Sequence, residues 1–256
     1  MNNVSRDYMI KLLEKGKRID GRRFEDLRKV EISYEISKHA EGAARVKFGS
    51  TEVIVGVKLE VGKPFPDNPN EGTIIVGAEM LPLSSPDFES GPPSVNSIEL
   101  ARVVDRAIRE SHAIDLEKLC IKEGEEVWMV LIDIYTINDG GNLQDASALA
   151  ALAALKQAKF PSYDGKKIDY SKKTGKLPIA SLPVECSVVR IKDKLLSDPC
   201  LDEEKMMDAR LTIGITENND ICAMQKAGKG IFRFEDISEM IEVSLKNSEK
   251  LRKLLK

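Results

Sequence analysis

The sequence predicts an α+β protein made of two related halves, in each of which a mixed or antiparallel sheet packs against helices. Three observations predict this class. Runs of alternating apolar residues in the first half are followed by helical patterns, and the same order recurs in the second half. A segment rich in lysine and glycine lies between the halves. We therefore expect a boundary there and interpret the two halves as an ancient duplication.

Residues 1–29 are expected to form an N-terminal helix and arm. The spacing of apolar residues predicts a short amphipathic helix over residues 4–15, with Gly16 available to end it. The apolar side of this helix contains Val4, Met9, Leu12 and Leu13. We interpret the helix as a docking arm.

The first half is expected to span residues 30–165 and to begin with a hairpin. Two strand-like runs, GAARVKF and TEVIVGVKLE, are joined by Gly49-Ser50. The runs TIIVGAEMLPL and EEVWMVLIDIYTI predict two further strands. Loops rich in Pro, Gly, Asn and Ser interrupt the pattern at residues 64–72 and 84–96. Their composition is typical of loops that line a site.

Two helices are predicted in the first half. One begins near Asn96, which can cap it, with Glu99 at the capping-box position. Its apolar stripe is expected to contain Leu100, Val103, Val104, Ala107 and Ile108. The other helix covers about residues 145–159 and consists mostly of alanine and leucine, so it can pack closely against a sheet.

The second half is expected to span residues 184–256, after a polar connector over residues 166–183. Alternating patterns predict three strands, and helical spacing predicts one long C-terminal helix. The expected strands lie near residues 184–192, 209–216 and 220–227, and the expected helix covers about residues 235–255.

The charge balance limits the kind of partner that the chain can bind. The sequence of 256 residues has 39 basic and 42 acidic side chains, which gives a net charge of -3. This balance argues against a surface coated with basic charge, so a nucleic acid would have to bind at one focused patch. No run approaches the roughly 20 apolar residues of a membrane span, and the charged N-terminus is unlike a signal peptide. We expect a cytoplasmic protein with no membrane partner.

Cysteine and histidine usage argues against metal and redox chemistry in this chain. The four cysteines are scattered without C-x-x-C spacing, and there are only two histidines. We therefore expect neither a zinc site nor a disulfide framework.

Three arginines on the first predicted helix form a candidate nucleic-acid site. Arg102, Arg106 and Arg109 follow one another at i, i+4 and i+7, opposite the apolar stripe. Guanidinium groups bind phosphate oxygens in bidentate fashion, so such a row could follow the phosphates of a single strand. The alternative is a solvated face whose charge is balanced by Glu99, Asp105 and Glu110.

Two other motifs could carry chemistry. Asp139-Gly140-Gly141-Asn142 lies at a strand-to-helix junction, where backbone N–H groups can hold an anion, although turn chemistry alone also explains it. An acidic cluster lies between two strands of the second half and could hold magnesium or transfer protons, or form a solvated turn. Its members are Asp198, Asp202, Glu203, Glu204 and Asp208.

These segments together resemble the RNase PH family over nearly the whole chain. The resemblance rests on RIDGRRFEDLR, EGAARVKFGSTEVIVGVKLE, AEMLPLSSP, NSIELARVVDRAIRES and DGGNLQDASALAALAAL, in that order. It implies the RNase PH fold, a half similar to domain 2 of ribosomal protein S5 followed by a C-terminal RNase PH half. Within the family, the chain is most similar to the non-catalytic RNase PH-like subunit of the archaeal exosome.

The resemblance also implies partners and a role. Subunits of this type alternate with an active RNase PH-like subunit in a six-membered ring, which also carries RNA-binding cap subunits. Single-stranded RNA threads the ring, and the active partner degrades it from the 3′ end with phosphate and possibly magnesium. Arg102 and Arg106 match the arginines of the non-catalytic subunit that hold RNA phosphates, and Arg109 is a third candidate.

Departures from the active pattern suggest that this chain has no cofactor and no catalysis of its own. Active members have the motif G-G-T-R, whereas here Leu143 follows Gly140-Gly141-Asn142, and the loop SSPDFESGPPS has two acids and no base. Each lost charge-assisted contact costs about 1.5–3 kcal/mol, so losing two weakens phosphate binding roughly a hundredfold or more.

One feature favours an alternative function. Asp202 and Asp208 reproduce the spacing of the acidic pair in active members, so the chain could itself be a phosphate-dependent 3′ exoribonuclease that uses these two acids. A third hypothesis is that the chain transfers phosphoryl groups between small molecules. The lack of a G-x-x-x-x-G-K-[ST] loop argues against this hypothesis.

Overall fold

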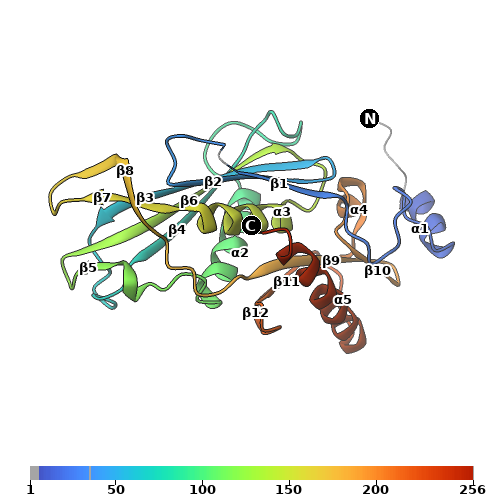
Figure 1. The fold of residues 1–256 in the computed structure, drawn as a ribbon. Helices are drawn as coiled ribbons and strands as arrows, with labels where there is room; N and C mark the ends of the chain where they lie inside the picture. The colour runs from blue at the N-terminus through green and yellow to red at the C-terminus, as the bar shows by residue number, and fades with distance from the viewer. Residues whose placement is uncertain (1–5, 35, 256) are drawn as a thin grey trace.

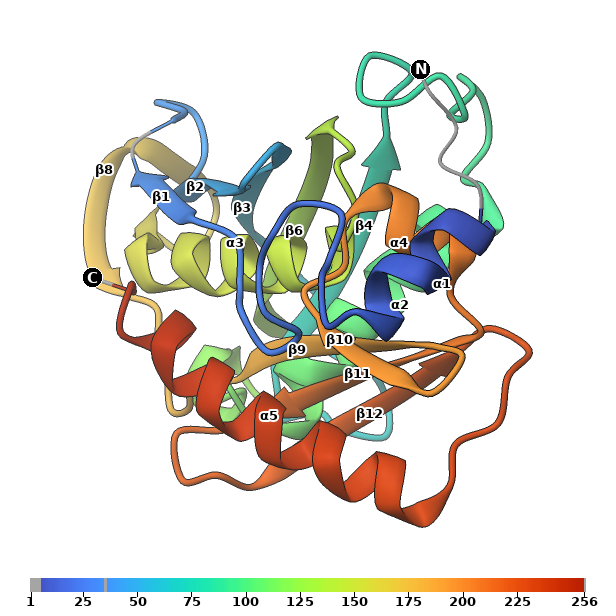
Figure 2. The ribbon, with the colours of Figure 1, turned by 90° about the vertical axis from the view of Figure 1, so that its right-hand side faces the viewer.

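The computed structural model describes residues 6–34 and 36–255. Its elements are stacked in four layers (Figures 1 and 2): a first sheet, two helices, a second sheet and a C-terminal helix. The predicted α+β class is confirmed. In the described part of the chain, no helix is long and apolar enough to cross a membrane.

The first sheet contains the predicted hairpin. Strand order is β1-β2-β3-β6-β4, with β5 paired to β6, and all neighbours are antiparallel except β4 and β6. Phe48 pairs with Thr51 across Gly49-Ser50, and Gly49 has a φ of +56°, which favours glycine. The strands are β1 (Val30–Tyr34), β2 (Gly42–Phe48), β3 (Thr51–Gly62), β4 (Thr73–Met80), β5 (Cys120–Lys122) and β6 (Glu126–Asn138).

Helices α2 (Val95–Glu110) and α3 (Leu143–Gln157) lie between the two sheets (Figure 2). Because α3 touches both sheets, 13 of its 15 residues are buried, which explains its alanine-rich composition. The contact with β2 is close: a Cβ on Gly42 would lie 2.2 Å from the carbonyl oxygen of Ala154. Small side chains are therefore required where α3 meets the first sheet.

The second sheet has the antiparallel order β10-β9-β11-β12. Helix α5 (Phe234–Arg252) covers the face of this sheet opposite α3 (Figure 2), and its Met240 packs on Val188 and Leu211. The strands are β9 (Val184–Ile191), β10 (Lys194–Ser197), β11 (Ala209–Ile215) and β12 (Ile221–Ala227). Three of these strands and α5 lie close to their predicted positions, whereas β10 was not predicted.

Helix α1 (Arg6–Glu14) docks on the chain's own second half. Met9 and Leu13 pack against Val189, Ile191 and Leu196. Val4, which the sequence analysis assigned to this helix, lies outside the described residues.

Three sequence-based expectations differ from the structure. The cap of α2 is Ser94, which accepts a hydrogen bond from Ser97, so the prediction of Asn96 as cap is wrong. The predicted connector, residues 166–183, contains β8 (Ile168–Lys176), which pairs with β7 (Lys159–Tyr163) in a hairpin. Two short helical elements, η1 (Glu117–Leu119) and α4 (Leu201–Met206), were not predicted.

Candidate nucleic-acid interface

Arg102 and Arg106 form a pair of unengaged cations on α2. The helix buries its apolar stripe, including Leu100 and Val104, and leaves both arginines exposed one turn apart. Neither guanidinium forms a hydrogen bond or an ion pair with any residue in 6–34 or 36–255. Both groups are therefore available to an external anion.

Arg109, the third predicted member of the row, is already engaged. Its Nη2 donates to Asp105 Oδ1 at 2.7 Å and to the carbonyl oxygen of Ile74 at 3.0 Å. An RNA phosphate would have to compete with these contacts. The structure therefore brings two of the three predicted arginines to a free surface.

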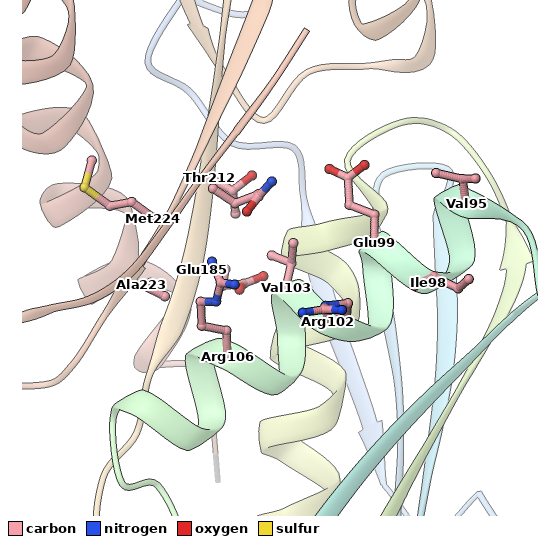
Figure 3. Close-up of a pocket in the computed structure, with 12 residues that line it drawn as sticks. Val95, Ile98, Glu99, Arg102, Val103, Arg106, Glu185, Thr212, Ala223 and Met224 are labelled. Carbon is pink, nitrogen blue, oxygen red and sulfur yellow. The ribbon is translucent and has the colours of Figure 1, made fainter.

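Two cavities flank the arginine pair. One, of about 280 Å³, lies between α2 and the second sheet and is lined by Arg102, Arg106, Glu185 and Thr212 (Figure 3). The other also has about 280 Å³ and is lined by Arg102, Arg106, Arg109, Val76, Ala101, Asp105 and Glu110.

The loop after β4 lines a third cavity beside the start of α2. This cavity has about 560 Å³, and its lining includes the acids Asp87 and Glu89 of the loop. The loop thus lines a hollow, and its expected role in lining a functional site stays a prediction. Its charged side chains are acidic, so it offers no cation to a phosphate group.

Leu143 lines a fourth cavity, of about 280 Å³, at the N-terminus of α3, where a phosphate would meet backbone amides. Internal charged groups already fill this region. The Glu204 carboxylate accepts a hydrogen bond from the backbone N–H of Asn142. Arg210 lies 3.4 Å from both Glu204 and Glu99, so the cavity's arginine is bound to internal acids.

Arg210 is a cavity residue that sequence reasoning missed, and Glu204 was predicted only as one member of the acidic cluster. Glu204 and Arg210 line the cavity together. They have the same spacing as Asp202 and Asp208, shifted by two positions. The Asp208 carboxylate instead accepts hydrogen bonds from Arg6 at 2.6 Å and from the Lys192 backbone at 2.7 Å. Neither aspartate lines this cavity.

The Asp139-Gly140-Gly141-Asn142 junction is packed from both sides. Gly141 has a φ of +89°, and a Cβ there would lie 2.4 Å from the backbone nitrogen of Leu201. Its N–H donates to Asp139 Oδ1 at 3.0 Å, so this amide already has an internal acceptor. The junction therefore positions α3 against α4, and nothing in its geometry supports the anion site considered from sequence.

Two other acids of the predicted cluster are buried and paired. Asp198 accepts hydrogen bonds from Arg22, Arg28 and Asn142 at 2.6–3.0 Å. Burial alone would raise the pKa of Asp198. Its hydrogen bonds with Arg28 and Asn142 and the charge of Arg28 outweigh burial, so the pKa of Asp198 lies below its ordinary value. Glu203 pairs with Arg18 at 2.6 Å, and both side chains are buried. These acids hold the N-terminal arm to the second half.

The Glu204 carboxyl should make stability depend on pH. Burial raises its pKa from 4.5 to about 7, although Arg210 opposes the shift. Because its pKa is raised, the folded state binds the proton of Glu204 more tightly than the unfolded state does. The stability that this proton contributes is therefore lost as pH rises from about 4.5 to about 7. The Glu204 side chain is 17% exposed, and solvent screens its charge in part. We therefore expect the free energy of unfolding to fall by about 2 kcal/mol over this pH range.

Glu204→Gln should therefore be about 2 kcal/mol more stable than the wild type at pH 8 and equally stable near pH 4.5. Urea unfolding at a series of pH values measures this difference. Glu125→Gln, at a side chain that is 61% exposed, serves as the control and should follow the wild type. Parallel pH profiles for Glu204→Gln and the wild type would contradict the prediction.

Family models match both halves of the chain. The model for domain 1 of the 3′ exoribonuclease family matches residues 26–161, and that for domain 2 matches residues 181–247. The chain belongs to this family, the RNase PH family. Its α2 arginines and Leu143 thus lie within the matched domain 1, whereas Glu204 and Arg210, which line the same cavity as Leu143, lie within the matched domain 2.

Curated relatives match this RNase PH-family chain along its full length. Exosome complex component Rrp42 of Thermococcus kodakarensis is 46% identical and is matched over 100% of this chain and 96% of the relative. The same component of Archaeoglobus fulgidus is 47% identical, over 99% and 96% of the two chains.

Solved structures agree with the family assignment. A chain of the Archaeoglobus fulgidus exosome with RNA bound to the active site is 47% identical, has a TM-score of 0.93, and covers 98% of this chain and 97% of its own. A chain of an archaeal exosome core is 45% identical and has a TM-score of 0.86. The match covers 96% of this chain and 94% of that one. Rice Rrp46, at 18% identity and a TM-score of 0.70, shares the fold.

Proposed function

We propose that this chain is an RNA-binding, non-catalytic ring subunit of an exosome complex. The observation that carries the proposal is the free pair Arg102 and Arg106. In a separate cavity, Leu143 and Glu204 occupy the surroundings of the α3 N-terminus. The full-length similarity to archaeal exosome components supports the placement in a ring.

The Leu143 cavity is unsuited to phosphorolysis. That reaction requires a phosphate ion held in line with the scissile bond and its charge compensated. Leu143 provides no charge, and the Glu204 carboxylate would repel an anion. Arg210 already lies beside Glu99 and Glu204, so binding phosphate would break existing ion pairs.

The arginine pair suits a supporting role in RNA binding. Two arginines four residues apart are attached about 6 Å apart along the helix axis, so their guanidinium groups can contact neighbouring phosphates of one strand. Such contacts fix the strand's position without reading its sequence. The chain would thus hold RNA while a partner cleaves it.

The proposal includes the partners expected from the family. An active RNase PH-like subunit would alternate with this chain in a hexameric ring, and RNA-binding cap subunits would sit on the ring. Phosphate, and possibly magnesium, would act at the partner's site. We place the complex in the cytoplasm, where its RNA substrates would be found.

The double variant Arg102→Ala/Arg106→Ala tests the RNA-binding role. We expect roughly hundredfold weaker binding of a 5′-labelled single-stranded RNA, because two charge-assisted contacts are lost. The slope of log affinity against log salt should fall by about 1.4, since each phosphate contact contributes about 0.7. Fluorescence anisotropy at several salt concentrations measures both quantities.

A charge-matched control is Arg23→Ala/Lys29→Ala, which also removes two exposed basic side chains. It should change affinity and salt slope much less. Equal losses in the two double variants would show that net charge, and not the arginine pair, governs binding.

The absence of catalysis is tested with the isolated chain. Incubated with 5′-labelled RNA, magnesium and phosphate, it should leave the RNA intact, and shortening should begin when an active RNase PH-like partner is added. Shortening by the chain alone, abolished by Asp208→Ala, would favour the alternative exoribonuclease function.

A further inference from the structure

The cavity between α2 and the second sheet has polar and apolar walls in an arrangement that suggests a ligand (Figure 3). Arg102 and Arg106 lie on the α2 side, and Glu185 and Thr212 project from the strands on the opposite side. Val95, Ile98, Val103, Ala223 and Met224 supply apolar surface. The cavity of about 280 Å³ thus combines a cationic side, a polar floor and apolar walls.

Glu185 is the polar group that this cavity leaves unexplained. Its residue is 1% exposed, and its Oε2 atom has no hydrogen-bond partner within the described chain. Neither Arg102 nor Arg106 forms an ion pair with it among the residues described. Buried polar groups in folded proteins are normally hydrogen-bonded, so an unpaired one beside a cavity points to a missing partner.

The Glu185 carboxyl offers a specific hydrogen-bonding pattern. Burial, reinforced by Asp145 and opposed by Arg210, raises its pKa well above the ordinary value of 4.5. A protonated carboxyl places one donor next to one acceptor. Every RNA base presents a donor next to an acceptor on its pairing edge, so this group can bind any base.

We propose that this cavity holds one nucleotide of the bound RNA, with the base against Glu185 and the apolar walls and the adjoining phosphates on Arg102 and Arg106. The inference rests on the proposed RNA-binding function and adds a base-binding subsite to it. Base contact without preference for one sequence suits a subunit that must pass many RNAs.

The first test uses the wild-type full chain at low salt. Its affinity for a fluorescent single-stranded oligoadenylate is compared with that for an abasic ribose-phosphate oligomer of the same length. We expect about tenfold tighter binding of the oligoadenylate, because the abasic oligomer lacks the contact with Glu185. Equal affinities would overturn the proposal whether or not any variant folds.

Two variants of Glu185 sharpen the test. Glu185→Gln keeps a donor beside an acceptor and should bind oligoadenylate like the wild type. Glu185→Leu removes both and should bind oligoadenylate about tenfold more weakly, with unchanged affinity for the abasic oligomer and unchanged salt slope. Thermal unfolding verifies that both variants are folded. Wild-type affinity in Glu185→Leu would overturn the proposal.

The outcomes separate this inference from the proposed function. If the arginine double variant loses affinity and salt slope while Glu185→Leu does not, RNA binding stands and the base subsite fails. If the wild-type chain binds neither oligomer, both fail. Hydrogen exchange gives a further check: protection of β12 on addition of the partner subunit, with no change on adding RNA, would show that protein fills the cavity and overturn the inference.

Discussion

Replacing Asp198 with alanine should lower the free energy of unfolding by about 3–5 kcal/mol, because it leaves two buried guanidinium groups without their common carboxylate. Asp198 is fully buried, and the Arg28 and Arg22 side chains are 9% and 14% exposed. The expected fall in Tm is roughly 6–20 °C for a chain of this size. Urea unfolding and thermal melting at neutral pH measure the two quantities.

An exposed ion pair supplies the control for Asp198→Ala. Glu125 pairs with Lys122, and both side chains are more than 60% exposed, so Glu125→Ala should change stability by less than about 1 kcal/mol. The same small change in Asp198→Ala would contradict the structural role assigned to its carboxylate. Asp198→Asn keeps the shape and removes the charge, and should fall between these limits.

Gly141→Ala should destabilise the fold by about 4 kcal/mol. The residue has a φ of +89°, which L side chains rarely adopt, and a Cβ would meet the backbone of Leu201 at 2.4 Å. Backbone atoms cannot swing aside as the end of a side chain can, so α3 and α4 would have to separate. Urea unfolding measures the loss, and Tm should fall by roughly 10 °C.

Gly56→Ala is the matched control for Gly141→Ala. Gly56 lies within β3, and a Cβ there would meet nothing within 4 Å. Since alanine is not strained in a strand, this variant should be as stable as the wild type or slightly more so. A similar loss in both variants would show that the close approach at Gly141 is not the cause.

These two predictions concern the contacts that hold the Leu143 cavity in place. Asp198 fixes Asn142 through a hydrogen bond of 2.8 Å, and Gly141 allows α4 to approach α3. The Glu204 carboxylate on α4 can then accept a hydrogen bond from the backbone N–H of Asn142. The packing that stabilises the chain thus also places a carboxylate where an anion would bind.

The sequence by itself determined the elements whose signals are local. Alternation with period 2 predicted the β2–β3 hairpin, and helical spacing predicted the apolar stripe of α2. The same spacing placed Arg102 and Arg106 on the opposite, exposed side. Leu143 could also be identified from sequence, because it stands two positions after the glycine pair.

The tertiary structure alone decided which charged groups are free and which meet. The spacing of Asp202 and Asp208 is identical to that of Glu204 and Arg210, and only the turn of α4 selects the second pair. Helical spacing made Arg109 a third candidate beside Arg102 and Arg106, but Asp105 and the Ile74 carbonyl engage its guanidinium group. Asp105 lies one turn from Arg109 on the same helix, but the Ile74 carbonyl belongs to β4, and a local periodicity carries no information about contacts between elements.

Glu185 shows the same limit most clearly. In sequence it is an acid at the start of a strand, a position that is usually solvent-exposed for this residue type. Burial on both faces of β9, between α3 and α5, places its carboxyl inside the protein beside a cavity. The sequence specified the residue, and the stacking of layers around it determined its environment.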